Sequence, residues 1–240
     1  MYLVELTWNE LVELSRERVV LLPWGALEQH GRHLPLGTDL FLLEAICSRL
    51  EAQCGELLLT GPVLRPSDSA RHLSYPGTVS LPPETALAPL LETARALVGI
   101  GFQRLLILNG QYGNRFLVEL ALRELRQRHS GVSAVGLSYW DLLPEEERSE
   151  DHAGALETAL MLHLFPDRVR KGQIVPDGLQ LASPYASRVL HYLRTDQRSR
   201  SGGWGDPTCA TADQGRKWLQ TILEHLERLI RDLIDGRLTV

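Results

Sequence analysis

The feature that most constrains this chain is the alternation of short apolar runs with longer amphipathic stretches along almost its whole length. Buried strands are predicted at 18–25, at 55–64 (cut short by Pro62), at 104–108 and at 131–140. Strands that alternate with helices are typical of βαβ units, whose mainly parallel sheet is covered by helices on both faces. We therefore predict an α/β fold, with residues 1–240 forming a single domain.

The stretches between the apolar runs place their hydrophobic residues at helical spacing. Helices are predicted at 40–54, 80–101, 114–129, 153–164 and 212–235. Segment 195–208, rich in Gly and Ser, is predicted to be a ligand-facing loop rather than a domain boundary. In parallel sheets, binding sites collect at the carboxyl ends of the strands, so the polar residues in those loops are the candidates for function.

Composition excludes several classes of function. The net charge of −5 leaves no basic surplus to neutralise phosphates, which argues against nucleic-acid binding. No apolar segment reaches the roughly 18–20 residues needed to cross a bilayer, and the N-terminus lacks the features of a secretory signal. The three cysteines form no metal-type pair, so we expect reduced thiols and a cytoplasmic protein without membrane or nucleic-acid partners.

The densest polar cluster follows the first predicted strand, in the stretch GALEQHGRHLPLGTD at 25–39. Glu28 and His30 are two residues apart, so in extended backbone they point the same way and can ligate one centre. Asp39 follows a Pro/Gly loop that can fold back, and its two oxygens can bridge two metals. Carboxylate and imidazole together suit Zn²⁺, Mn²⁺ or Fe²⁺ better than Ca²⁺. A solvated loop with one capping histidine is the alternative interpretation of these residues.

Five motifs in order give the chain a resemblance to a known family. They are LPWGALEQHGRHLPLGTD, SARHLSYPGTVSL (69–81), GFQRLLILNGQYGN, DHAGALETALML (151–162) and GGWGDPTCATADQG (202–215). Together they resemble the creatininase (creatinine amidohydrolase) family over nearly the whole chain. The resemblance implies a three-layer α/β/α sandwich and a metal-dependent amidohydrolase.

The resemblance also implies roles for individual residues. Glu28, His30 and Asp39 match metal ligands of the family, with Asp39 as the bridge, and His152 matches its catalytic histidine. Glu157 matches a glutamate that acts at the catalytic centre as a ligand or as a partner of one. Substrate contacts are implied for Ser69 and Tyr112, and His33 and His72 fit family patterns either as contacts or as residues that orient a loop.

The chemistry of an amidohydrolase accounts for these residue types. One or two divalent ions acidify a bound water and polarise the amide carbonyl. His152 can then protonate the leaving nitrogen, which an amide requires because an amine anion is a poor leaving group. We expect Asn109 and Asn114 to hold their loop in shape.

One position departs from the family pattern. The family usually has Asn-Gly-His-Gly-Gly-Asn where this chain has NGQYGN, so Gln111 stands at the place of a ligand histidine. Gly113 stands where creatininase itself has a ligand glutamate. Since a carboxamide is a poor zinc ligand beside imidazole, three outcomes are open. One metal persists beside His30 and Asp39, or Mn²⁺ or Fe²⁺ replaces zinc, or metal binding is lost.

The sequence therefore supports two hypotheses of different class. The first is a metal-dependent hydrolase acting on a C–N bond other than a peptide bond in a small polar or cyclic substrate. Such an enzyme would belong to a specialised biosynthetic pathway, by hydrolysis or by amide formation. Gln111, Tyr112, Ser69 and Trp140 are its candidate substrate-binding residues, and family resemblance implies a homo-oligomer, a hexamer. The second is a catalytically silent creatininase-fold subunit or binding protein with a degenerate metal site.

Overall fold

A four-stranded, fully parallel sheet forms the centre of the molecule in the computed structural model, which describes residues 1–148, 151–178 and 192–238. Its strands lie in the order β2–β1–β3–β4. Their bounds are Val19–Trp24 for β1, Leu58–Thr60 for β2, Arg104–Asn109 for β3 and Ser133–Ser138 for β4. Residues 19–24 pair in register with 104–109, and these in turn with 133–138, so three strands end at one level.

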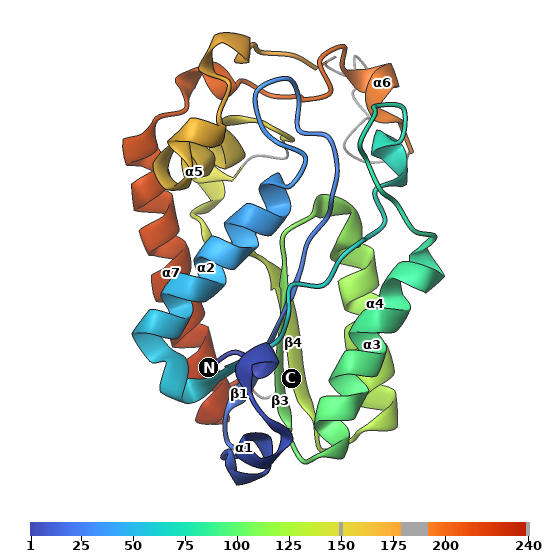
Figure 1. Ribbon diagram of the computed structural model, residues 1–240, viewed down its shortest axis with the longest axis vertical. Coiled ribbons are helices and arrows are strands. Elements are labelled where there is room, and N and C mark those ends of the chain that lie inside the picture. The colour runs from blue at the N-terminus through green and yellow to red at the C-terminus, as the bar shows by residue number, and fades with distance from the viewer. Residues whose placement is uncertain (149–150, 179–191, 239–240) are drawn as a thin grey trace.

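Helices cover both faces of this sheet (Figure 1). One face carries α2 (Thr38–Cys54), α5 (Ala155–Leu164) and α7 (Ala212–Ile234). The opposite face carries α3 (Pro83–Gly99) and α4 (Arg115–Arg128). Two short helices, α1 (Trp8–Glu13) and α6 (Thr195–Arg198), lie outside these layers. The predicted three-layer α/β/α sandwich is confirmed.

Alternate side chains of the central strands supply two separate cores. Val19 and Leu21 of β1 pack with α2, α5 and α7, whereas Val20 and Leu22 pack with α3 and α4. Every residue of β1 is buried, as expected for a strand inside a sheet that is covered on both faces. The near-continuous apolar runs in the sequence are the consequence.

The observed helices and the three longer strands follow the predicted ranges closely, with two differences in the shorter elements. The strand predicted at 55–64 is only three residues long, because Gly55–Leu57 forms a 3₁₀ turn and regular pairing with β1 stops at Thr60. The chain stays beside β1 and pairs with it again at an isolated bridge between Leu64 and Trp24. The predicted loop at 195–208 contains the single turn of α6, whose Gln197 side chain accepts a hydrogen bond from the Arg194 backbone N–H. The single-domain assignment stays a prediction.

Among the described residues, no helix combines the length and apolar character that a membrane span requires. The loops that leave the carboxyl ends of β1, β3 and β4 meet at one end of the sheet, in the upper half of Figure 1. The candidate residues lie in or next to these loops, except Ser69 and His72, which come from the connection between β2 and α3. This end of the sheet is the place expected for a site in a parallel sheet.

Candidate metal centre

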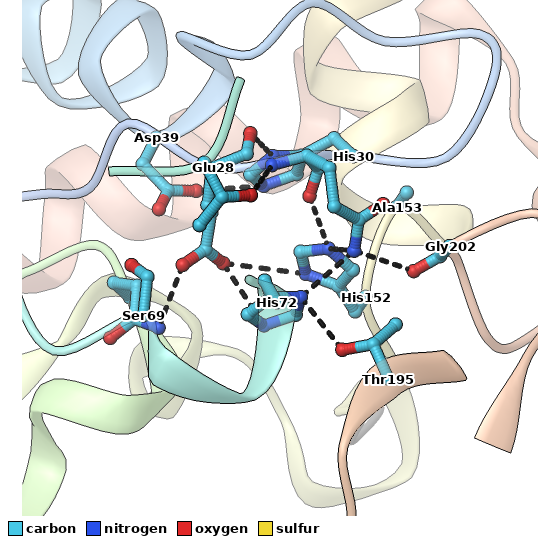
Figure 2. Close-up of polar contacts among 12 residues, drawn as sticks. Glu28, His30, Asp39, Ser69, His72, His152, Ala153, Thr195 and Gly202 are labelled. Carbon is cyan, nitrogen blue, oxygen red and sulfur yellow. Dashed lines mark hydrogen bonds and ion pairs between the residues drawn. The ribbon is translucent and has the colours of Figure 1, made fainter. Parts of the chain in front are cut away.

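The loop after β1 brings a carboxylate and an imidazole into the same buried space. Glu28 is held by its backbone N–H, which donates to the carbonyl of Leu36 at 3.1 Å, and the ring Nδ1 of His30 lies 3.0 Å from the carbonyl of Glu28. Asp39 enters from the first turn of α2, where the helix N-terminus favours a carboxylate. Ligand atoms of Glu28, His30 and Asp39 lie within 4.8 Å of one another. Figure 2 shows the three side chains gathered at one place.

Two atoms of this cluster are buried and have no aligned hydrogen-bond partner in the described part of the chain: His30 Nε2 and Asp39 Oδ2. His30 Nε2 lies 2.9 Å from Asp39 Oδ1, close enough for an ion pair but not directed along a hydrogen bond. Buried polar atoms are nearly always satisfied, so atoms left over in this way fit a divalent ion. Glu28, His30 and Asp39 are therefore the residues that would hold it.

The electrostatics of the cluster agree with a cation site. Burial, reinforced by the charge of Asp39, raises the pKa of Glu28 to about 8, and burial raises the pKa of Asp39 to about 6. Burial alone would lower the pKa of His30, but the carboxylates of Asp39 and Glu157 outweigh it and hold that pKa well above its usual value. Without a cation, the chain can keep these anions buried only by binding protons.

His152 and Glu157 lie at the beginning of α5. The backbone N–H of Ala153 donates to Glu157 Oε2 at 2.6 Å, and Ala153 has a positive φ of 53°. Glu157 Oε1 lies 3.6 Å from His30 Nε2, so this side chain joins the His152 segment to the proposed ligand His30. His152 is buried, and its Nδ1 lies 3.8 Å from Glu28 Oε1. Burial, with the charge of His30 adding to it, lowers the pKa of His152 well below its usual value.

The opposite side of Glu28 is occupied by Ser69 and His72. Ser69 hydrogen-bonds the Glu28 carboxylate, and His72 Nε2 lies 3.4 Å from Glu28 Oε1. Burial lowers the pKa of His72 to about 3. Ser69 was predicted to contact substrate, but it lies behind Glu28 and is not among the described residues that line the cavity. His33 is placed where it orients the loop, with its Nε2 2.8 Å from the hydroxyl of Thr158.

Gln111 enters the site from the loop after β3. Its Nε2 donates to Glu28 Oε2 at 3.1 Å, and its Oε1 accepts the backbone N–H of Asn114 at 2.8 Å. A backbone N–H can only donate, so the atom facing Asn114 must be the amide oxygen. The end of Gln111 that faces Glu28 is therefore the NH₂ group, which has no lone pair for a metal.

Two further features shape this second loop. The side chain of Asn109 holds it, because Asn109 Nδ2 donates to the carbonyl of Gln111 at 2.8 Å and Oδ1 accepts the N–H of Gln111 at 3.1 Å. At Gly113, an added Cβ would lie only 2.7 Å from the carbonyl oxygen of Asp68. A ligand side chain at position 113 would thus require the backbone to move.

A cavity of about 300 Å³ opens beside the cluster. Glu28, Asp39, His152 and Glu157 line its inner end, and the predicted substrate contacts Gln111, Tyr112 and Trp140 also line it. Tyr139 lines the cavity as well, and its hydroxyl is buried without a hydrogen-bond partner among the described residues. The sequence also predicts that the loop at 180–204 lines the pocket, and part of this loop lies outside the described residues.

Sequence reasoning did not single out Gln29, Tyr139, Thr195 or Gly202. In extended backbone the side chain of Gln29 points away from those of its neighbours Glu28 and His30, so the spacing that indicated those two residues did not indicate Gln29. Thr195 contacts His72, which is 123 residues away in the sequence, and Gly202 contacts Gln29, which is 173 residues away. The position of Gln29 between two candidate ligands was the one local signal that could have identified it.

The fold and the cluster define an α/β/α protein with a buried carboxylate–histidine site at the carboxyl ends of its strands. The sequence profile of the creatininase family, described as creatinine amidohydrolase, matches residues 4–230. The chain therefore belongs to the creatininase family.

Individual relatives agree with this assignment. The creatinine amidohydrolase of Pseudomonas putida is 33% identical over 254 residues, covering 95% of each chain. A mycofactocin precursor peptide peptidase of Mycobacterium ulcerans (strain Agy99) is 34% identical over 209 residues, covering 82% of this chain and 78% of the relative. A solved creatininase structure described as a Zn–Zn type mutant superposes with a TM-score of 0.80 at 29% identity, covering 96% of this chain and 97% of that one.

Proposed function

We propose that this protein is a divalent-metal-dependent hydrolase that cleaves a C–N amide bond in a small polar or cyclic substrate. The observation that carries the proposal is the buried cluster of Glu28, His30 and Asp39 beside a cavity. His30 Nε2 and Asp39 Oδ2 have no aligned hydrogen-bond partner among the described residues, which fits a cation between them. Similar creatininase structures carry manganese or zinc, which supports the same class of ion here. Bound at this cluster, the ion would supply an acidified water and polarise the amide carbonyl.

The chain's own residues would complete the reaction. His152 holds its Nδ1 toward Glu28 beside the cavity, where it can take a proton from the attacking water and pass that proton to the leaving nitrogen. Glu157 fixes the segment that carries His152 and supports His30 from the side. Tyr112 and Trp140 form cavity walls that would orient the substrate.

A peptide substrate is the second candidate, because one relative at 34% identity is a peptidase of a precursor peptide. A specialised biosynthetic role, by hydrolysis or by amide formation, fits either substrate. The remodelled loop at Gln111 argues against creatinine itself. We also propose a homo-oligomer, a hexamer by family resemblance, which light scattering at micromolar concentration would test.

The first experiment measures metal and activity together. Protein expressed with added Zn²⁺, Mn²⁺ or Fe²⁺ is assayed for bound metal by mass spectrometry, and against creatinine, other cyclic amides, formamides and short peptides. At least one transition metal per chain, with hydrolysis of one amide class, supports the proposal. Absence of bound metal from every preparation would contradict it and favour a silent subunit or binding protein.

A further inference from the structure

Gln29 lies between the candidate ligands Glu28 and His30 but points away from them, into the histidines on the far side of the site. It is buried, with 4% of its surface exposed. Its Nε2 lies 2.8 Å from His72 Nδ1, 3.1 Å from His152 Nε2 and 2.8 Å from the carbonyl of Gly202. One side chain thus contacts both histidine rings. Figure 2 shows these two rings beside Glu28.

The orientation of the Gln29 amide is fixed by backbone groups at both ends. Its Oε1 accepts the N–H of Gly31 at 3.0 Å, and its Nε2 donates to the carbonyl of Gly202. A backbone N–H only donates and a carbonyl only accepts, so exchanging the oxygen and nitrogen of the amide would break both bonds. Gly202 has a φ of +96°, and a Cβ there would collide with Gln29 Oε1, so the fit depends on glycine.

This orientation determines which nitrogen of His72 carries the proton. The NH₂ of Gln29 can only donate, so His72 Nδ1 accepts from it. The hydroxyl of Thr195, 2.9 Å from the same nitrogen, can donate or accept and is therefore compatible with this assignment. The ring proton therefore resides on Nε2. That Nε2–H lies on the side of the ring near Glu28, with Nε2 3.4 Å from Glu28 Oε1.

The backbone of Gln29 makes the corresponding assignment for His152. Its carbonyl lies 2.7 Å from His152 Nε2, and a carbonyl can accept only from a protonated nitrogen. The contact of 3.1 Å between His152 Nε2 and the Gln29 amide nitrogen is then an approach of two donors rather than a hydrogen bond. The lone pair of the neutral ring lies on Nδ1, the atom nearer Glu28.

We propose that Gln29 is the positioning residue that sets the tautomers of both histidines, through its side chain at His72 and through its carbonyl at His152. His72 then carries a proton on Nε2, the nitrogen nearer Glu28, and cannot ligate a metal through that atom, although Glu28, His72 and His152 lie close enough to form a ligand group. His152 Nδ1 is the only nitrogen of the two rings that is available for proton transfer.

The test is a long-range ¹H–¹⁵N correlation spectrum of the ¹⁵N-labelled protein, recorded metal-free and with Zn²⁺, which is diamagnetic. His72→Asn and His152→Asn identify the two sets of signals by their disappearance. We expect both rings to be protonated at Nε2 and not at Nδ1, with or without zinc. A proton on His72 Nδ1 in the wild-type protein would overturn the proposal without recourse to any variant. The readout is independent of activity, so it does not depend on the proposed reaction.

Substitution of Gln29 separates its role from general packing. In Gln29→Glu a carboxylate that accepts replaces the amide that donates, so His72 should gain a proton on Nδ1, while His152 keeps its Nε2–H because a backbone carbonyl holds it. Gly202→Ala, which displaces the amide, should shift the His72 signals as well. Gln127→Glu on the exposed side of α4 is the matched control and should change neither ring. A folded Gln29→Glu protein with an unchanged His72 would contradict the assignment.

Discussion

The loops after β1 and β3 leave adjacent strands at the same level, yet they present opposite chemistry to the site. The β1 loop, together with the start of α2, offers Glu28, His30 and Asp39, and two of their atoms have no hydrogen-bond partner in the described chain. The β3 loop offers Gln111, whose amide oxygen and nitrogen are both bonded within the protein. One loop is arranged to receive a cation, and the other to fix a carboxylate in place.

Gln111 donates to Glu28, so the β3 loop supports a proposed ligand and offers no lone pair of its own at that point. Supporting hydrogen bonds of this kind orient metal ligands and tune their affinity. If the resemblance is right that relatives have a ligand histidine at this position, one substitution changes the metal capacity of the site while the fold is kept. Four experiments test this difference between the two loops and the roles proposed for the residues around them.

The largest effect is expected at the β1 side. Asp39→Asn should abolish metal binding and hydrolysis, because it removes the charge that faces His30. The metal-free variant should melt no lower than the wild type, since burial already opposes ionisation of Asp39 and raises its pKa to about 6. Metal analysis and circular dichroism check both statements, with exposed Asp167→Asn as the control. A fully loaded, active Asp39→Asn protein would refute the ligand assignment.

The next effect concerns proton transfer at α5. His152→Ala should lower kcat on an identified amide substrate about a hundredfold, as expected for loss of a general acid or base, with metal retained. Turnover and metal content are measured on the same preparation. His163→Ala, on the same helix but away from the cavity, is the control. Unchanged turnover would leave His152 with a structural role only.

A smaller effect is expected when the β3 loop is given back the family residue. Gln111→His should add a second zinc equivalent or raise zinc affinity about tenfold, roughly 1.4 kcal/mol, because imidazole has the lone pair that the NH₂ of Gln111 lacks. Isothermal titration of the metal-free protein compares the variant with wild type and with Gln111→Met. Identical stoichiometry and affinity for Gln111→His and wild type would show that position 111 does not face the metal.

The smallest effect is a pH dependence of stability in the metal-free protein. A carboxyl whose folded pKa is raised contributes stability that is present below its unfolded pKa and is lost as pH rises toward the folded one. The pKa of Glu28 is raised to about 8, and that of His30 is also raised. The pKa values of His72 and His152 are lowered, so these two groups change the stability only below the ordinary histidine value of 6.5. The melting temperature should therefore fall between pH 6.5 and 8.

Bound Zn²⁺ should abolish that fall, because the ion replaces the protons as the counter-charge. Thermal melts with and without zinc at three pH values measure the difference. A metal-free protein that becomes more stable over this range would show that Glu28 does not remain protonated in the fold.

Apolar periodicity was sufficient to predict the layers of the fold. Residues 19–24 and 105–109 are buried in a sheet covered on both faces, which requires a continuous apolar run in the sequence. The strand at 58–60 is shorter than predicted because a 3₁₀ turn precedes it and regular pairing with β1 is interrupted between Thr60 and the bridge at Leu64. The turn of α6 was missed since four residues give no measurable period.

The candidate site was predictable only in part. Glu28, His30 and Asp39 are close in sequence, so their spacing and family pattern indicated a common centre. The orientation of Gln111 could not be predicted without the positions of Asn114 and Glu28 in space. The backbone N–H of Asn114 orients the Gln111 amide, and the amide then donates to Glu28. Contacts such as Gln29 with Gly202 join distant segments, and a single sequence contains no record of them.

The left-handed Ala153 has a consequence for how this site can evolve. Ala153 links His152 to α5, and its N–H donates to the carboxylate of Glu157. The position of His152 and that of Glu157 therefore depend on the same hydrogen bond. Substitutions at 152 and 157 should accordingly be epistatic, with the double mutant losing less than the sum of the two single losses. We therefore expect adaptation to new substrates to occur by substitution of the cavity-lining residues Tyr112 and Trp140, which do not take part in that hydrogen bond.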